Sequence, residues 1–347
     1  MDRTKRFFVF FRQAIKHIPR YFAVQRPNAL EYSLLAKLPA ELLQQIADDL
    51  PPASAASFSL SCRQIHFSIG NRYLHDLASS SDETLVFLDL IEHDLQDQIV
   101  CSSCRKLHKI KYAKKYTQKC FLYDPVVIPN CLFDDMRKMI PIHIDENFST
   151  IVFKMVMKHY RLFGDDIQVR RLCGLLTDGF RMSPWGGTLI KKRQSECRIR
   201  NGSLFICKRI AFHGNCADVK PHSIWFYICP HLEVESVERP ASLRIMSHSV
   251  SNEGWLIVLH RENGTKIKKT SWDLGSEVQQ CRYCRTEYKA EFEHGNECTM
   301  KSTFTIWKDL GHGPETEEWK AQMPSDDSLS VPERIQFHRG EIASFFQ

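Results

Sequence analysis

Cysteine and histidine are the residues of this chain whose spacing points to chemistry. The sequence of 347 residues contains thirteen cysteines, four of them in two Cys-x-x-Cys pairs. Cys101 and Cys104 form the first pair, and His108 follows four residues later. Cys281 and Cys284 form the second. Thiolate and imidazole groups are the ligands that structural zinc prefers, and it takes four of them in a tetrahedron. The pattern therefore predicts bound zinc.

The ligands can be grouped into one site or two, and the spacing alone leaves that choice open. We expect a first site built by four residues, in which a Cys-Pro-His segment meets the second pair: Cys229, His231, Cys281 and Cys284. A second site would use the first pair, the histidine after it and the next cysteine: Cys101, Cys104, His108 and Cys120. The alternative is that these cysteines are small buried hydrophobic residues. That role is expected for four others: Cys62, Cys131, Cys173 and Cys207.

Composition favours a reduced, intracellular protein. The odd number of cysteines has no secretory signal beside it, because the only N-terminal apolar run, Phe7 to Phe11, is short and ends at Arg12. This predicts the cytoplasm, the nucleus or both. No apolar stretch approaches the ~20 residues of a membrane span. The sequence also lacks a phosphate-binding loop, a Gly-x-Ser-x-Gly elbow and a His-Glu-x-x-His motif, so we expect no enzymatic activity.

The segment from residue 38 to residue 63 has the clearest helical pattern. Proline at position 39 suits a first helical turn, and Glu41 beside it interacts favourably with the helix dipole. Apolar residues then recur at helical spacing until Pro51 and Pro52 end the helix. Two further helices are expected over residues 53–60 and 62–75. The sequence thus predicts a three-helix module over residues 33–80.

The rest of the chain predicts helices first and then antiparallel strands. Helices are expected over residues 83–94 and 148–163, where apolar residues share one face. Two Asn-Gly pairs, at 201–202 and 263–264, suit tight hairpin turns, so that Ile199 faces Leu204 and Cys197 faces Ile206. Further strands are expected over 223–228 and 302–307. The fold class is therefore α+β, with a mostly antiparallel sheet from about residue 185 to 310 and a loop or mobile tail over 311–335.

Basic residues dominate two segments. Residues 1–32 form a basic amphipathic arm, which either packs on the domain that follows or acts as a membrane-surface or targeting helix. The run from Arg105 to Lys119 contains seven basic residues and no acid, with Tyr112 and Tyr116 among them. Such a run can track a phosphate backbone. A solvated loop is the commoner explanation, so a nucleic-acid partner is not expected.

The helical module resembles an F-box, the short segment by which a protein binds the Skp-type adaptor of a cullin ubiquitin ligase. Eleven residues carry the resemblance, and the resemblance implies that the same residues contact the adaptor. They are Leu38, Pro39, Leu42, Leu43, Ile46, Leu50, Pro51, Phe58, Leu60, Cys62 and Arg63. A group of F-box proteins from filamentous fungi is similar in further segments, namely residues 87–92, the Cys101/Cys104 pair with Leu107-His108, Cys229-Pro230-His231-Leu232, the Cys281/Cys284 pair and Trp307 to Gly311.

With this resemblance, which covers residues 34–320, the chain is expected to contain an F-box over 33–80 and a cysteine-rich α+β domain with zinc knuckles over 81–320. Composition adds the arm over residues 1–32 and a tail over 321–347. The resemblance also implies a function, namely that of an adaptor subunit that links the Skp-type protein and its cullin to an unknown protein substrate. The alternative is a zinc-stabilised nucleic-acid-binding or structural interaction protein outside a ubiquitin ligase.

Overall fold

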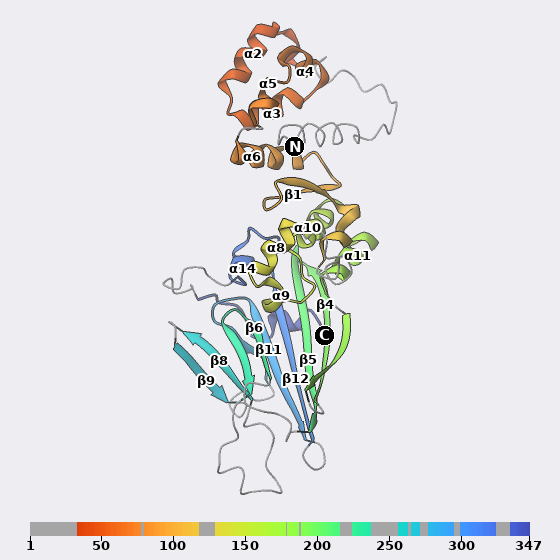
Figure 1. The fold of residues 1–347 in the computed structure, drawn as a ribbon, viewed down its shortest axis with the longest axis vertical. Helices are drawn as coiled ribbons and strands as arrows, with labels where there is room; N and C mark the ends of the chain where they lie inside the picture. The colour runs from red at the N-terminus through yellow and green to blue at the C-terminus, as the bar shows by residue number, and fades with distance from the viewer. Residues whose placement is uncertain are drawn as a thin grey trace. The chain divides into compact units, whose positions relative to one another are not determined.

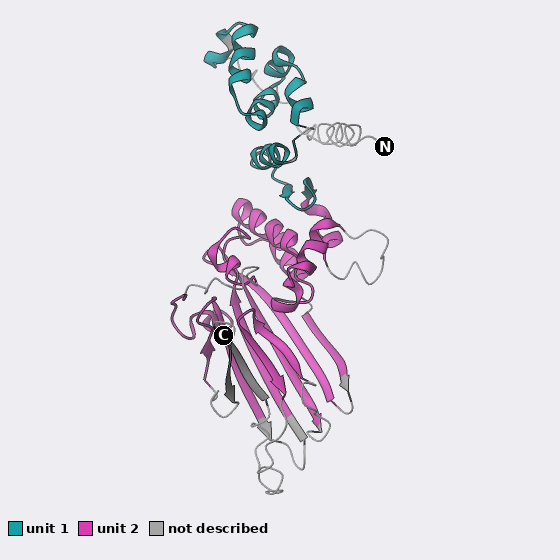
Figure 2. Ribbon diagram, turned by 60° about the vertical axis from the view of Figure 1, so that its left-hand side comes forward, with its two compact units in different colours: residues 1–108 teal, residues 109–347 magenta. Residues whose placement is uncertain are grey.

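The chain divides into two compact units, Met1–His108 and Lys109–Gln347, which Figure 2 colours separately. The computed structural model describes residues 33–77, 80–117, 129–177, 179–186, 189–215, 224–236, 256–262, 265–270, 277–294, 299–323 and 334–347. The basic arm predicted over 1–32 and the predicted ligand Cys120 lie outside these residues. The described elements include both α-helices and antiparallel sheets, so the α+β class is confirmed.

The first unit is mainly helical. Its elements are η1 (Leu34–Lys37), α2 (Ala40–Asp49), α3 (Pro52–Leu60), α4 (Arg63–Ile69), α5 (Arg72–Leu77), α6 (Ser81–Glu92), β1 (Gln98–Cys101) and β2 (Lys106–Lys109). Pro39 and Pro51 precede α2 and α3, and Cys62 caps α4 by accepting a hydrogen bond from the N–H of Ile65. The single helix predicted over 62–75 is divided in two, because Gly70 takes a positive φ of 79° and ends α4.

The core of this unit extends past residue 80, the predicted end of the module. Phe87 and Leu88 of α6 are buried in the same cluster as residues of α2 to α5. The Glu83 carboxylate also accepts a hydrogen bond from the N–H of Ala53, at the start of α3. An acceptor there satisfies an N–H that has no partner within the helix. Helix α6 is therefore part of the same packed unit as the predicted F-box.

The second unit begins with helices. They are η2 (Ile110–Tyr116), α8 (Asn130–Arg137), α9 (Ile140–His143), α10 (Thr150–Phe163) and α11 (Ile167–Leu176). Helix α10 confirms the prediction over 148–163, and Gly164, with a φ of 75°, ends it. The Asp166 carboxylate then caps α11 by accepting a hydrogen bond from the N–H of Val169 at 2.7 Å. These helices lie at one end of the long strands in Figure 1.

Two antiparallel sheets follow. The six-stranded sheet has the order β10-β11-β12-β5-β4-β3, and the four-stranded sheet has the order β6-β7-β8-β9. The strands of the larger sheet are β3 (Gly179–Gly186), β4 (Leu189–Arg200), β5 (Ser203–Asn215), β10 (Gln279–Gln280), β11 (Thr286–His294) and β12 (Thr299–Asp309). Those of the smaller sheet are β6 (Trp225–Cys229), β7 (Leu232–Ser236), β8 (Leu256–Glu262) and β9 (Thr265–Thr270).

Both predicted hairpins are present with the predicted register. Ile199 pairs with Leu204 and Cys197 with Ile206 in the β4–β5 ladder. Asn201 and Gly202 take the positive φ values, 50° and 79°, that a type I′ turn requires. Strands β8 and β9 pair from Glu262 and Thr265 outwards, while residues 263–264 lie outside the described parts of the chain. At Asn201-Gly202 the turn therefore sets the register of the β4–β5 hairpin.

The two sheets of the second unit share one apolar core. The Phe226 ring of β6 contacts Phe304 of β12 edge to face, with ring centroids 5.1 Å apart, and stacks near Phe212 of β5. Ile228 and Ile306 are completely buried in the same cluster. Aromatic pairs of this kind contribute more than their buried area alone. The core thus lies between the inner faces of the two sheets.

The tail predicted over 321–347, and the loop before it, were assigned wrongly for the described residues. Trp319 of α14 (Glu317–Lys320) is buried against Phe148 and Phe153, at centroid distances of 5.6 and 5.3 Å. Helix α15 (Glu341–Ser344) is held by Glu287 of β11, whose carboxylate accepts from the N–H groups of Gly340 and Ala343. The segment was predicted as a loop because most of its residues are polar, although a few large apolar side chains in it pack against the rest of the unit.

A buried lysine on the inner face of the large sheet makes stability depend on pH. Burial lowers the pKa of Lys208 from 10.5 to about 8, although the charge of the nearby Asp145 opposes the shift. Between these values the unfolded chain binds more protons than the native one, so stability rises with pH there. We expect the urea midpoint to be higher at pH 9.5 than at pH 8, with Lys208 contributing roughly 2 kcal/mol.

The matched test of this expectation is Lys208→Met, which keeps the length of the side chain without its charge. The increase in urea midpoint between the two pH values should be smaller in this variant. It should not vanish, because burial also lowers the pKa of Lys308 on the neighbouring strand. An equal increase in both proteins would show that Lys208 is solvated in the native state.

Candidate metal centre

Four predicted ligands converge at one end of the small sheet. Cys229 ends β6, His231 lies in the turn before β7, and Cys281 and Cys284 lie between β10 and β11. One ligand atom from each of these four residues lies within 4.8 Å of the other three. The Nδ1 atom of His231 is 4.0 Å from the Sγ atom of Cys229 and 3.7 Å from that of Cys281. The first predicted site is therefore assembled as expected.

Local backbone geometry aims these side chains at one another. The β6–β7 ladder shifts register between Tyr227 and Cys229, which places His231 in a tight turn. In the opposite segment the N–H of Cys281 donates to the carbonyl of Thr286 at 2.9 Å, which folds the Cys-x-x-Cys segment back on itself. The N–H of Tyr283 points at the Sγ atom of Cys281, 3.4 Å away. An amide directed at sulfur in this way stabilises a thiolate.

The donor set and its spacing fit a tetrahedral zinc ion. Zinc bonds of about 2.0–2.3 Å place neighbouring ligand atoms about 3.3–3.8 Å apart. The measured 3.7 Å falls within this range and 4.0 Å lies just outside it. Three sulfurs and one imidazole also favour zinc over calcium or magnesium, which bind oxygen. The cluster could therefore hold a zinc ion with little rearrangement.

Burial sets the charge state of these thiols. Burial raises the pKa of Cys229 and of Cys284, because the apolar interior disfavours a thiolate. The pKa of Cys281 is lowered although burial alone would raise it, since Cys229, Cys284 and His231 all offer it hydrogen bonds. A divalent cation at this position would favour the thiolate form of all three cysteines.

A buried lysine lies beside the cluster. Lys308 of β12 donates hydrogen bonds to the carbonyl of Ile228 and to the side-chain carbonyl of Gln322, and its charge interacts with the three cysteines. Gln322 in turn donates to the Thr286 hydroxyl, which lies 3.2 Å from the Sγ of Cys284. Three thiolates and one Zn²⁺ carry a net charge of −1, which one ammonium group balances. Such surrounding groups orient metal ligands and adjust their affinity.

A second cluster joins the other Cys-x-x-Cys pair. Within the first unit, ligand atoms of Cys101, Cys104 and His108 lie within 4.8 Å of one another. The N–H of Cys104 points at the Sγ of Cys101, 3.3 Å away. Cys131 was expected in the apolar core, and at the start of α8 it is buried, with 5% of its surface exposed.

The residues assigned to adaptor binding differ in exposure. Five of them are exposed on the first unit: Pro39, Leu42, Ile46, Pro51 and Arg63. Five are half-buried: Leu38, Leu50, Phe58, Leu60 and Cys62. Leu43 is only 4% exposed and packs in the core of the unit, so its assignment as a contact residue was wrong. Helical spacing places Leu42 and Leu43 on one broad apolar stripe, but only one of them can face inward.

The basic segment after the first Cys-x-x-Cys pair does not offer a free stacking surface. The ammonium groups of Lys111 and Lys115 both lie 5.0 Å from the centre of the Tyr112 ring. A base would have to displace these cations before it could stack there. The geometry therefore supports the solvated basic segment over a nucleic-acid site.

Comparison with known proteins adds no further assignment. No protein-family model matches the chain, and no curated protein or solved structure matches it either. Separately, none of the helices in the described parts of the chain is both long and apolar enough to cross a membrane. The function must therefore be argued from the residues themselves.

Proposed function

We propose that the chain is an F-box adaptor subunit, which links a Skp-type protein and its cullin ubiquitin ligase to a protein recruited by the second unit. The observation that carries this proposal is the outer face of α2. Leu42 and Ile46, four residues apart, are 43% and 38% exposed, while Leu43 and Ala47 of the same helix are buried. Apolar side chains displayed in this way on a short helix are typical of a helix-binding interface.

The ends of α2 add to this surface. Pro39 before the helix and Pro51 after it are both exposed, and each fixes the direction of the chain at a helix boundary. A partner that binds this face would therefore contact two large apolar side chains, with a conformationally restricted proline at each end of the helix. Rigid anchors lose little conformational entropy on binding, which suits a docking role.

The second unit would recruit rather than transform its partner. Cys229, His231, Cys281 and Cys284 would give a zinc ion four protein ligands, which leaves no coordination position for water or substrate. Zinc would thus stabilise this unit, and ubiquitin transfer would need the added ligase. Reduced cysteines of this kind suit the cytoplasm or the nucleus.

Affinity purification tests the proposal directly. We expect the tagged full-length chain, expressed in a fungal host, to recover a Skp-type adaptor and a cullin, identified by mass spectrometry. The purified chain alone should form no thioester with ubiquitin. Recovery of neither protein, at an expression level where other partners are enriched, would contradict the proposal.

A further inference from the structure

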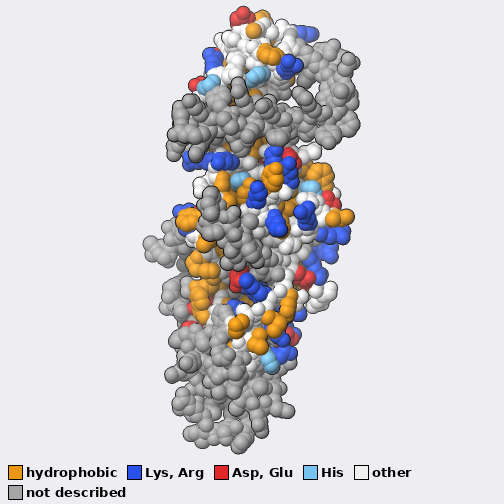
Figure 3. All heavy atoms as spheres, turned by 45° about the vertical axis from the view of Figure 1, so that its right-hand side comes forward, with side chains coloured by type: hydrophobic (Ala, Val, Ile, Leu, Met, Phe, Trp, Pro, Cys, Tyr) orange, Lys and Arg blue, Asp and Glu red, His pale blue; other side chains and the backbone are white. Residues whose placement is uncertain are grey.

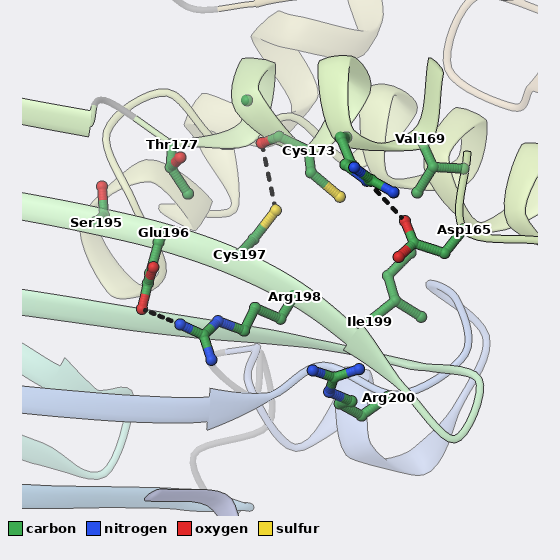
Figure 4. Close-up of a pocket in the computed structure, with 12 residues that line it drawn as sticks. Asp165, Val169, Cys173, Thr177, Ser195, Glu196, Cys197, Arg198, Ile199 and Arg200 are labelled. Atoms are coloured by element: carbon green, nitrogen blue, oxygen red, sulfur yellow. Dashed lines mark hydrogen bonds and ion pairs between the residues drawn. The ribbon is translucent and has the colours of Figure 1, made fainter. Parts of the chain in front are cut away.

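A pocket of about 380 Å³ lies where α11 crosses β4 in the second unit (Figure 4). The helix contributes Arg170 and Cys173 to its wall, the segment before the helix contributes Asp165, and the strand contributes residues 195–200. The Sγ of Cys197 donates to the carbonyl of Cys173 at 3.3 Å, so helix and strand are in contact at one side of the pocket. No motif of the sequence indicated this site.

The pocket surrounds the free edge of β4. Side chains alternate between the two faces of a strand, yet neighbours such as Cys197 and Arg198 both line this one pocket. Strand β3 pairs with β4 only as far as Gly179 and Ser195, while β5 covers the opposite edge up to Arg200. Among the described residues, therefore, no strand pairs with residues 196–200 on the pocket side. The backbone groups that alternate residues direct to this edge therefore have no strand partner in the described part of the chain.

The charges around the pocket favour an acidic ligand. Three arginines face two acids, and two of the arginines form ion pairs: Arg170 with Asp165 and Arg198 with Glu196, each at 3.4 Å. Both pairs are long and solvent-exposed, so they contribute little. Arg198 also donates to the carbonyl of Phe345 at 2.9 Å, so Arg170 is the arginine that can exchange Asp165 for another carboxylate. Arg200 is exposed and has no ion pair with any described residue. One cation thus remains without an acidic partner.

We propose that this pocket binds an acidic segment of a protein partner in extended conformation, which adds to β4 as a further strand. Main-chain hydrogen bonds to residues 196–200 would hold the segment, and Arg200 with Arg170 would select carboxylate side chains. The proposal rests on the proposed function, in which the second unit recruits a protein. The edge of β4 would set the orientation of the bound segment, and the arginines would make the pocket specific for acidic side chains.

Single-stranded nucleic acid is the other anionic polymer that the charges would attract. None of the residues that line the pocket is aromatic, so a base has no ring to stack on. Free backbone N–H and C=O groups also match a peptide, which carries donors and acceptors at the same spacing. The peptide is therefore the ligand that the site fits.

A displayed library of 12-residue peptides tests the proposal on the purified full-length chain without any adaptor. Selection on the unaltered protein, with counter-selection on Arg200→Glu, should enrich peptides with at least two acidic residues. Labelled copies of the enriched peptides should bind Arg200→Glu at least tenfold more weakly by fluorescence anisotropy. N-methylation at alternate peptide positions should abolish binding in one register only, which a purely electrostatic contact would not produce.

Lys192→Glu is the matched control, because Lys192 is exposed on the same strand outside the pocket and the variant has the same charge change. It should bind the peptides as the unaltered chain does. No enrichment, equal weakening by both variants, or displacement by an oligothymidine would each overturn the proposal. Since no adaptor is present, failure here is distinct from failure to recover a Skp-type protein.

Discussion

The double variant Cys281→Ser with Cys284→Ser is expected to lose one zinc ion per chain and to melt at a much lower temperature. Both sulfurs are buried ligand atoms of a cluster with Cys229 and His231. Metal binding is coupled to folding, because the unfolded chain has no preformed site. A loss of about 5 kcal/mol would lower the melting temperature by roughly 10–20 °C for a unit of this size.

Metal analysis and calorimetry of protein purified without chelator would measure both effects. The unaltered chain should contain up to two zinc ions, one for each cluster. Cys62→Ser is the control, since Cys62 caps α4 through its sulfur and serine is a better cap. That variant should keep its metal and its melting temperature. Full zinc content in the double variant would show that Cys281 and Cys284 are not zinc ligands.

The second large effect is expected on the outer face of α2. Leu42→Glu with Ile46→Glu should abolish recovery of the Skp-type adaptor while the chain stays folded, because both side chains are already exposed in the free protein. Burial of the part of these two side chains that is still exposed contributes about 1–2 kcal/mol, and an unpaired carboxylate in the interface costs more, so affinity should fall more than 10-fold. Quantitative pulldown and circular dichroism measure the two parts of this prediction.

Two controls separate a lost interface from a lost fold. Val86→Glu introduces one such charge at a 50% exposed position of α6 and should leave adaptor recovery unchanged. Leu43→Ala should instead destabilise the unit by about 2–5 kcal/mol, because Leu43 lies in its core. Adaptor recovery that survives Leu42→Glu with Ile46→Glu would exclude this face of α2 as the binding surface.

Local signals in the sequence predicted more of this structure than distant contacts did. Asn201-Gly202 set the register of β4 and β5, and each Cys-x-x-Cys pair belongs to a cluster that could hold a metal ion. The division of the helix at Gly70 was missed because apolar periodicity continues across it. Secondary-structure propensity reflects residues that are neighbours along the chain, whereas the end of a helix such as α4 also depends on tertiary packing.

The same limit applies to the C-terminal segment and to the pocket. Trp319 stands among acidic and glycine residues, so its neighbourhood reads as a loop until Phe148 and Phe153 are placed beside it. Among the described residues, β3 pairs with β4 only as far as Gly179, opposite Ser195, which leaves the last five residues of β4 without a strand on that edge. A sequence pattern can predict a strand, but not where its neighbour stops.

The central ladder of the large sheet also determines how the chain reaches this structure. Strand β5 pairs with β12, and the ladder brings Phe205 beside Asp309, about 100 positions further along the chain. Contacts of such separation form slowly, since loop closure must precede any gain from pairing. The β4–β5 hairpin can form early by itself, whereas the other edge of β5 stays unpaired until β12 is available. During synthesis or refolding the inner face of β5, with Ile210 and Phe212, therefore remains exposed until late, and this is the stage at which the chain is most prone to aggregate.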